Sequence, residues 1–193
     1  MAHEASSASS RPDGVGVRAR LFAATLGVWL LVVAAAALAL RVADEVPRML
    51  LGVPRGVRKV AGVAELERLA ARPMPLPSYY PDTIDWPPAE GRYELLGSAA
   101  LWCRLRAARV PALIIATAPA GSDQVSPDVL PRAVDLQREA GFLGSRPAAI
   151  ARLRGADGVI WQQVEWRGRR QIVLVRYRGT LDELMRIAGS VHE

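Results

Sequence analysis

Few residues in this chain combine reactive side-chain chemistry with a placement that catalysis could use. The two histidines, His3 and His192, lie close to the two ends of the chain. The single cysteine, Cys103, is expected on one strand face with Leu101 and Leu105, so we predict that it is a small buried apolar side chain. This distribution argues against Ser–His and Cys–His nucleophiles and against a histidine-based zinc site.

Phosphate-binding loops are also missing from the sequence pattern. No Walker-type loop and no G-x-G-x-x-G motif follows a predicted strand, and "GVG" at Gly14–Gly16 lies in the N-terminal tail. We therefore predict no catalytic residue, no cofactor-binding residue, no metal ligand and no cofactor.

Carboxylates are the remaining groups that could act as acids or bases. Asp82, Asp85, Glu90 and Glu94 are close in sequence, and two carboxylates that converge in a cleft can hydrolyse glycosides. Asp82 follows a proline, as turn residues commonly do, and acids in a proline-rich segment are usually solvated. We favour the solvated interpretation and keep a carboxylate-dependent hydrolase as a third hypothesis.

Aromatic and basic side chains suggest binding surfaces. Trp161 or Trp166 could meet Tyr177 across neighbouring strands, and with Trp102 they could line an apolar pocket, although core packing is the expectation we favour. Seven arginines could form one basic surface if their strands are neighbours, or they could lie on a solvated face. They are Arg104, Arg106, Arg167, Arg169, Arg170, Arg176 and Arg178.

The apolar stretch Leu21–Leu40 is the strongest signal in the chain. Its only polar side chain is Thr25, and twenty helical residues span about 30 Å, the thickness of a bilayer's hydrocarbon core. A cleaved signal peptide is the alternative, with Ala37–Ala39 as its exit site. The run is longer than a usual signal core, so we predict an uncleaved signal anchor, and the lack of a nearby cysteine excludes a lipoprotein.

The charges around this span bear on orientation and partners. We place residues 1–20 in the cytoplasm and residues 41–193 outside, because a long C-terminal domain can be translocated largely regardless of charge. The net charge is +6, and most of it lies in residues 1–60, which favours anionic headgroups over nucleic acid. The residues expected to contact headgroups are Arg48, Arg55, Arg58 and Lys59.

The rest of the chain has the pattern of an α+β domain. We expect residues 1–20 to be a disordered basic tail, residues 41–61 a basic juxtamembrane linker, and residues 62–193 the domain. "VAELERLAA" predicts a short helix, and from Tyr93 onward apolar runs broken by turn residues predict a mainly antiparallel meander.

Three further segments complete this prediction. The run "RAVDLQREAG" alternates like an edge strand, and Val173, Val175 and Tyr177 belong to a strand with two apolar faces. Thr180 and Glu183 have capping-box spacing at the start of a C-terminal amphipathic helix.

The proline-rich segment Pro73–Glu90 contains six of the fourteen prolines, two tyrosines and Trp86. Proline fixes φ and removes a backbone donor, so this segment cannot lie centrally in a sheet. We predict an extended strap between the first helix and the sheet, with Tyr79, Tyr80 and Trp86 packed against it. A polyproline ligand for another domain is the alternative.

The order of these segments resembles a family. "PLPSYYPDTIDW", "GVIWQQVEW" and "GTLDELMRIAGSV" are similar to segments of the small bacterial extracytoplasmic domains of unknown function on membrane-anchored anti-sigma factors and sporulation-associated lipoproteins. The resemblance covers roughly residues 62–192 and implies structural roles for the prolines and for the C-terminal helix. The zinc-binding cytoplasmic domain of the anti-sigma relatives has no counterpart in the twenty residues before the span.

The sequence thus leads to a functional hypothesis. We expect a single-pass protein of the bacterial cytoplasmic membrane whose extracytoplasmic domain binds or senses an envelope protein or an apolar ligand without catalysing a reaction. The alternative is an accessory subunit of a larger membrane complex.

Overall fold

A computed structural model of the chain describes residue 29 and residues 31–37, 56–88 and 90–192. The chain divides into two units, Met1–Leu51 and Gly52–Glu193, which are considered separately. In the first unit, Trp29 and residues 31–37 are helical and exposed. The remainder of the predicted span Leu21–Leu40, the predicted tail and most of the predicted linker lie outside the described residues.

The structure bears on the predicted membrane-spanning helix Leu21–Leu40 only through the residues that it describes. Among the residues that the structure describes, no helix has both the length and the apolar character needed to cross a membrane.

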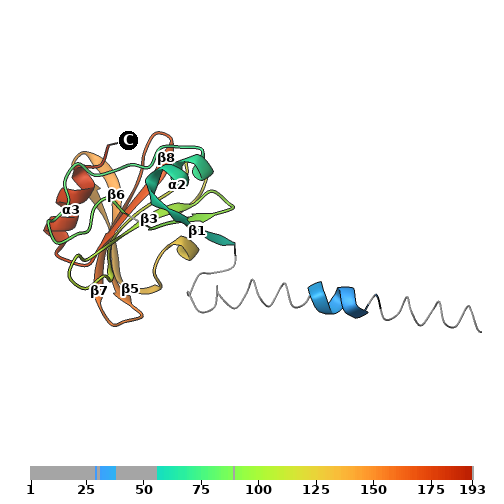
Figure 1. Cartoon of the computed structure of the whole chain (residues 1–193). Coiled ribbons are helices and arrows are strands. Elements are labelled where there is room, and N and C mark those ends of the chain that lie inside the picture. Colours follow the sequence, from blue (N-terminus) through green and yellow to red (C-terminus); the bar gives the residue numbers. More distant parts are fainter. Residues whose placement is uncertain (1–28, 30, 38–55, 89, 193) are drawn as a thin grey trace, which may run out of the picture. The chain divides into compact units, whose positions relative to one another are not determined.

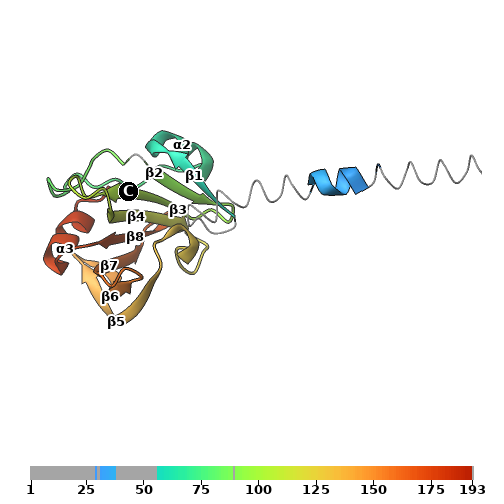
Figure 2. The same cartoon turned by 60° about the horizontal axis from the view of Figure 1, so that its bottom comes forward.

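The second unit is built on one open antiparallel sheet of eight strands. Its strands follow the spatial order β1-β2-β3-β4-β8-β7-β6-β5, which Figure 2 shows from β2 to β5. Each strand pairs antiparallel with its neighbour, and β4 and β8 join two meanders at the centre. The strands are β1 (Val57–Ala61), β2 (Glu90–Glu94), β3 (Ala99–Arg104), β4 (Pro111–Pro119), β5 (Ala133–Leu143), β6 (Arg146–Gly155), β7 (Ile160–Arg167) and β8 (Gln171–Tyr177).

Both faces of the central strands are covered, because successive side chains of a strand point to opposite faces. Val173, Val175 and Tyr177 of β8 belong to a core shared with helices α2 (Gly62–Ala70) and α3 (Leu181–Gly189). Ile172 and Leu174 belong to a second core with the 3₁₀ helix η1 (Pro127–Val129). The predicted two-sided strand and the α+β class with a mainly antiparallel sheet are confirmed (Figure 1).

The sheet begins earlier than the sequence analysis expected. Residues Val57–Ala61 were included in the basic linker, and the domain was expected to start at Gly62, but they form β1 and pair with β2. Val57 and Val60 are buried, whereas Arg58 and Lys59 between them are exposed. The adjacent charges of Arg58 and Lys59 separate the two buried residues of this five-residue strand, so the strand was not predicted.

The helix ends match the prediction in part. Helix α2 ends at Ala70, followed by Ala71 with a φ of 52°. At the start of α3, the Glu183 backbone N–H donates to Thr180 Oγ1, as predicted. The Glu183 carboxylate instead accepts a 2.8 Å hydrogen bond from the Tyr177 hydroxyl, so the reciprocal half of the capping box is not made.

From Pro73 to Pro88 the proline segment crosses from α2 to the sheet without forming a strand, and β2 begins at Glu90. It forms isolated bridges from Pro77 to Val191 and from Ile84 to Leu105, with further backbone hydrogen bonds beside them. The rings of Tyr80 and Trp86 stack with their centroids 4.7 Å apart and, with Tyr79, pack against the core as half-buried side chains. These contacts fit the predicted structural strap.

Candidate functional site

The candidate site lies on strands β1, β2 and β3 at one end of the sheet. Glu90 begins β2 and lies opposite Trp102 of β3, while Lys59 of β1 lies opposite Arg92 of β2. Side chains two residues apart share a face of a strand, so Glu90 and Arg92 lie together, as do Trp102 and Arg104. The local strand pattern therefore gathers four polar groups beside one indole ring.

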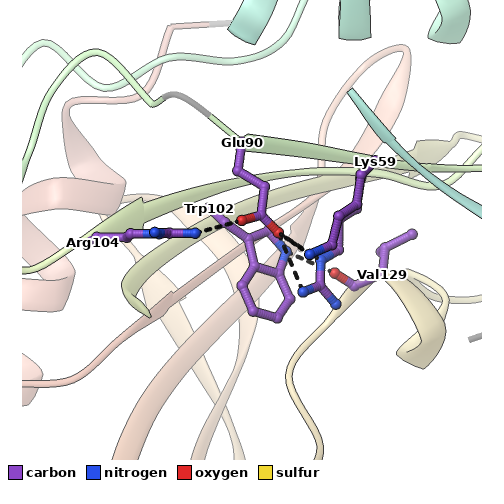
Figure 3. A network of polar contacts seen from close by, with 6 residues as sticks. Lys59, Glu90, Trp102, Arg104 and Val129 are labelled. Carbon is purple, nitrogen blue, oxygen red and sulfur yellow. Dashed lines mark hydrogen bonds and ion pairs between the residues drawn. The ribbon is translucent and has the colours of Figure 1, made fainter. Parts of the chain in front are cut away.

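Three cationic side chains converge on the Glu90 carboxylate (Figure 3). Arg104 Nη2 lies 2.9 Å from Glu90 Oε2, whereas Arg92 Nε and Lys59 Nζ lie 3.3 Å and 3.6 Å from Oε1. The side chain of Arg104 is 47% exposed and that of Arg92 only 10%. Arg92 is thus part of the packed domain, and Arg104 remains open to solvent.

An aromatic platform supports the cationic group from beneath. The Arg92 guanidinium carbon lies 3.5 Å from the centre of the Trp102 ring, close enough for a cation–π interaction. Trp102 Nε1 donates a 2.9 Å hydrogen bond to the carbonyl oxygen of Val129 in η1. The hydrogen bond holds the Trp102 ring in place, and the ring in turn positions Arg92 beside Glu90.

Lys59, Glu90, Trp102 and Arg104 line a cleft of about 370 Å³. Arg109 reaches this cleft from the β3–β4 turn, where it adopts a φ of 56°, and the proline segment contributes Asp85 and Pro87. The cleft is lined by the two carboxylates of Asp85 and Glu90 and by three cationic side chains, while Arg92 contacts Glu90 from within the domain. The cleft therefore has a positive excess even though Glu90 neutralises part of it.

The electrostatics of Glu90 determine what the site can do. Burial by itself would raise the pKa of Glu90, but the hydrogen bond from Arg104 and the charges of Lys59 and Arg92 together lower the pKa below its ordinary value. A carboxylate held ionised in this way is poorly suited to donate a proton. The surrounding guanidinium and ammonium groups are suited to bind phosphate or carboxylate oxygens.

The four carboxylates singled out from the sequence do not converge. Asp85 and Glu90 line the cleft, whereas Asp82 and Glu94 do not. Asp82 is exposed. One carboxylate oxygen of Glu94, Oε2, is buried without a hydrogen-bond partner in the described structure. The paired arrangement expected of a glycosidase is therefore not formed by this set.

The seven arginines do not form a single surface either. Arg176 is only 6% exposed, and Arg167 hydrogen-bonds to carbonyl oxygens of the loop after β4. Arg178 forms a 2.6 Å ion pair with Asp157. Strands β7 and β8 are neighbours, but β4 lies between β3 and β8, so the arginines of β3 are not beside those of β7 and β8 and the alternative of one basic surface is not realised.

Two aromatic contacts with Tyr177 were considered: Trp166 belongs to the same core as Tyr177, whereas Trp161 does not. Trp161 belongs to the core on the η1 side, and Tyr177 to the core on the helical side, so these two rings lie on opposite faces. Trp102, Trp161 and Trp166 are all buried, which agrees with core packing.

The structure describes the predicted environment of Cys103 and of one of the two histidines. Cys103 is 1% exposed, and burial raises the pKa of its thiol to about 12, as expected for an inert apolar side chain. His192 is exposed near the C-terminus, and His3 lies outside the described residues. Within residues 56–88 and 90–192, no group of three or more His, Cys, Asp or Glu side chains is arranged to hold a metal ion.

The structure describes two of the four residues that were expected to contact headgroups. Arg48 and Arg55 lie outside the described residues, Arg58 is exposed on β1, and Lys59 pairs with Glu90. Lys59, Glu90 and Arg104 were predicted as parts of three separate features, and Arg92 was not among the predicted site residues. The alternation of Glu90 with Arg92 on one strand face was the local signal that could have linked two of them.

Comparisons of the chain with models of protein families, with curated proteins and with solved structures found no match.

Proposed function

We propose that this chain is a non-enzymatic, single-pass membrane protein of the bacterial envelope whose extracytoplasmic domain binds an anionic ligand in the β1–β3 cleft. The anchor is Leu21–Leu40, with the N-terminus in the cytoplasm. Support for the anchor is the length and apolarity of that sequence. The observation that carries the binding function is the convergence of Lys59, Arg92 and Arg104 on one carboxylate at a cleft with excess positive charge.

Glu90 acts in this proposal as an internal counter-ion. It keeps Arg104 and Lys59 in place while the cleft is empty, and an incoming phosphate or carboxylate group competes with it for the same donors. Arg109 adds a further cation at the rim; no carboxylate of the described residues forms an ion pair with it. Planar guanidinium groups can bind such oxygens through two hydrogen bonds at once.

The binding proposal is tested with the full chain in nanodiscs of neutral phosphatidylcholine. Inorganic pyrophosphate serves as the probe and is titrated by calorimetry at low ionic strength. We expect Arg104→Ala to weaken binding about fivefold, because one charged hydrogen-bond donor contributes on the order of 1 kcal/mol at a partly exposed site. Arg170→Ala, which removes a charge from the β7–β8 turn, is the matched control and leaves the affinity unchanged.

The source of the anion is distinguished in a second arm. Nanodiscs that contain phosphatidylglycerol present the same chemistry as lipid headgroups. If headgroups occupy the cleft, these nanodiscs weaken pyrophosphate binding to the parent chain; if the ligand is soluble, the affinity stays within the range expected from surface charge alone. The proposal fails if pyrophosphate does not bind, or if Arg104→Ala and Arg170→Ala weaken it equally.

The membrane orientation has an independent test. Protease added to intact spheroplasts digests residues 41–193 if this part is extracytoplasmic, and the mass of the mature chain shows whether residues 1–40 are retained. Protection until lysis contradicts the orientation.

The other two hypotheses predict different results. An accessory subunit remains in a stable complex after detergent extraction and sizing, whereas the binding domain runs as a separate species. A carboxylate-dependent hydrolase loses its cellular phenotype when Asp82 and Asp85 are both changed to alanine while the fold is retained.

A further inference from the structure

The opposite end of the sheet presents a long edge strand. Strand β5 is the last in the spatial order and pairs only with β6 among the described strands. It has eleven residues, and most of its side chains are exposed. Val134 is 70% exposed, Leu136 46% and Phe142 66%, which is unusual for large apolar side chains on one strand.

The other edge of the sheet differs in both length and charge. Strand β1 has five residues, and its exposed positions include Arg58 and Lys59. Short length and charged side chains are two common ways in which proteins protect an edge from pairing. Strand β5 has a bulge between Asp135 and Gln137 and an Asp135–Arg138 ion pair, but its remaining length keeps a regular register with β6.

A hollow of about 360 Å³ lies at the N-terminal part of this edge. Its walls include Val134 and Leu136, and two guanidinium groups, those of Arg132 and Arg154, border it. Both arginines are exposed, and no ion pair joins either of them to a carboxylate of the described residues. The hollow thus combines exposed apolar surface with two uncompensated positive charges.

A second, larger hollow lies farther along β5, with a volume of about 770 Å³. Three of its lining residues are alanines. They are Ala140, Ala148 and Ala149. Arg138 and Arg167 already have partners in Asp135 and in loop carbonyl oxygens. Three carboxylates from Asp123, Glu139 and Glu165 also border the hollow, so its excess charge is negative.

Two residues that line the hollows, Arg154 in the smaller and Ala149 in the larger, point to opposite faces of the sheet. Val134 lies opposite Arg154 of β6, whereas Ala140 lies opposite Ala149. Arg154 and Ala149 are five residues apart on a strand with a continuous register, and an odd separation places two side chains on opposite faces. A strand added beside β5 would direct alternate side chains to these same two faces.

We infer that the β5 edge binds an extended segment of a partner protein, which adds to the sheet as a ninth strand. The segment places an apolar side chain on Val134 and Leu136, an acidic side chain near Arg132 and Arg154, and a basic side chain about five residues away over the larger hollow. Backbone hydrogen bonds hold such a strand, while side-chain pockets and charges select its sequence. This edge is separate from the β1–β3 cleft, and the inference does not depend on anion binding there.

The test uses the full chain in neutral detergent and a fluorescein-labelled peptide of twelve residues. The peptide alternates valine and threonine and has one glutamate and one lysine five positions apart, and its fluorescence anisotropy measures binding. A control peptide has lysine in place of the glutamate. We expect the acidic peptide to bind and the control to bind about tenfold more weakly, the change expected for loss of one well-placed charge pair.

Charge reversal on the protein makes the test specific. Arg154→Glu is expected to weaken the acidic peptide about tenfold and to strengthen the control peptide. Arg170→Glu introduces the same charge change in the β7–β8 turn and leaves both affinities unchanged. Val134→Lys weakens both peptides because it removes the apolar contact that they share.

Three results would overturn the inference. The first is that neither peptide binds. The second is that both bind equally well and Arg154→Glu has no effect. The third is that sedimentation shows a dimer of the chain which Val134→Lys dissociates, because the edge would then be occupied by a second copy.

Discussion

Arginine side chains lie in two regions of this domain that differ in their exposure to solvent. Arg176 of β8 is buried and donates from Nε and Nη2 to the Gln163 side-chain oxygen, at 2.9 Å and 2.7 Å. Its Nη1 donates to the carbonyl oxygen of Pro131 at 2.7 Å. In the β1–β3 cleft, by contrast, Arg104 is about half exposed and bonds to a carboxylate that two other cations share.

The difference separates a cation used for packing from cations able to bind a ligand. Burial lowers the pKa of Arg176 to about 10, and its hydrogen bonds go to the neutral oxygens of Gln163 and Pro131. Because the Arg176 guanidinium is buried and hydrogen-bonded within the domain, it is not accessible to a ligand. Arg104 can exchange its internal partner Glu90 for an external anion, and Arg109 can bind such an anion directly, at little cost to the core.

The largest expected effect is on the free energy of unfolding, when the hydrogen-bond acceptor of the buried Arg176 is removed. Gln163→Leu removes the acceptor of two hydrogen bonds from Arg176 and leaves a buried charge poorly compensated. We expect the free energy of unfolding to fall by about 3 kcal/mol, measured by urea denaturation of the full chain in detergent. Gln137→Leu on the exposed edge is the control and changes it by less than about 0.5 kcal/mol. Equal effects of the two changes would show that Arg176 does not depend on Gln163.

The next effect concerns the strap that forms one side of the cleft. Trp86 lies between Asp85 and Pro87 of the cleft lining and stacks on Tyr80. Trp86→Ala is expected to reduce the free energy of unfolding by about 2 kcal/mol, below the value for a fully buried ring because this one is half-buried. Trp86→Phe retains an aromatic ring and most of the stability. An unchanged melting temperature in Trp86→Ala contradicts the structural account of the strap.

A smaller effect on stability is expected in the cleft itself. The pKa of Glu90 is lowered in the folded state, so its ionised form stabilises the fold above the unfolded pKa of about 4.3, and this contribution disappears as the pH falls through the folded value. Glu90→Gln should therefore cost about 1 kcal/mol at pH 7 and progressively less below pH ~4. Glu139→Gln on the exposed strand β5 provides the comparison. A cost that is independent of pH would contradict the assigned charge state.

The smallest stability effect is expected for a rim cation. Arg109→Ala should change the free energy of unfolding by less than about 0.5 kcal/mol, because Arg109 is exposed and its backbone is in a turn. The same variant should weaken pyrophosphate binding about threefold. A large loss of stability would place Arg109 with Arg176 as a structural cation, and the distinction between the two regions would fail.

Local patterns predicted most of the individual elements. The helix after Gly62, the β3–β4 pair, the last three strands and the cap at Thr180 each follow from short-range periodicity or from turn and cap residues. Strand β1 was missed because Arg58 and Lys59 dominate a segment with only two buried side chains.

The site required long-range information that no local pattern contains. Lys59, Glu90 and Arg104 come from three strands, and only their pairing register brings them together. The pairing of β4 with β8 is equally remote in sequence. Sequence reasoning could therefore identify the strands and the polar side chains, but not which charges meet.

The most direct test of the anion-binding cleft is the affinity of Glu90→Gln for inorganic pyrophosphate, compared with the parent chain in neutral nanodiscs. The substitution preserves shape and removes the internal competitor for Lys59, Arg92 and Arg104. We predict that pyrophosphate binds about fivefold more tightly to the variant, even though the variant is less stable. Equal or weaker binding by a correctly folded variant would contradict the account and would show that these cations serve only to hold β1, β2 and β3 together.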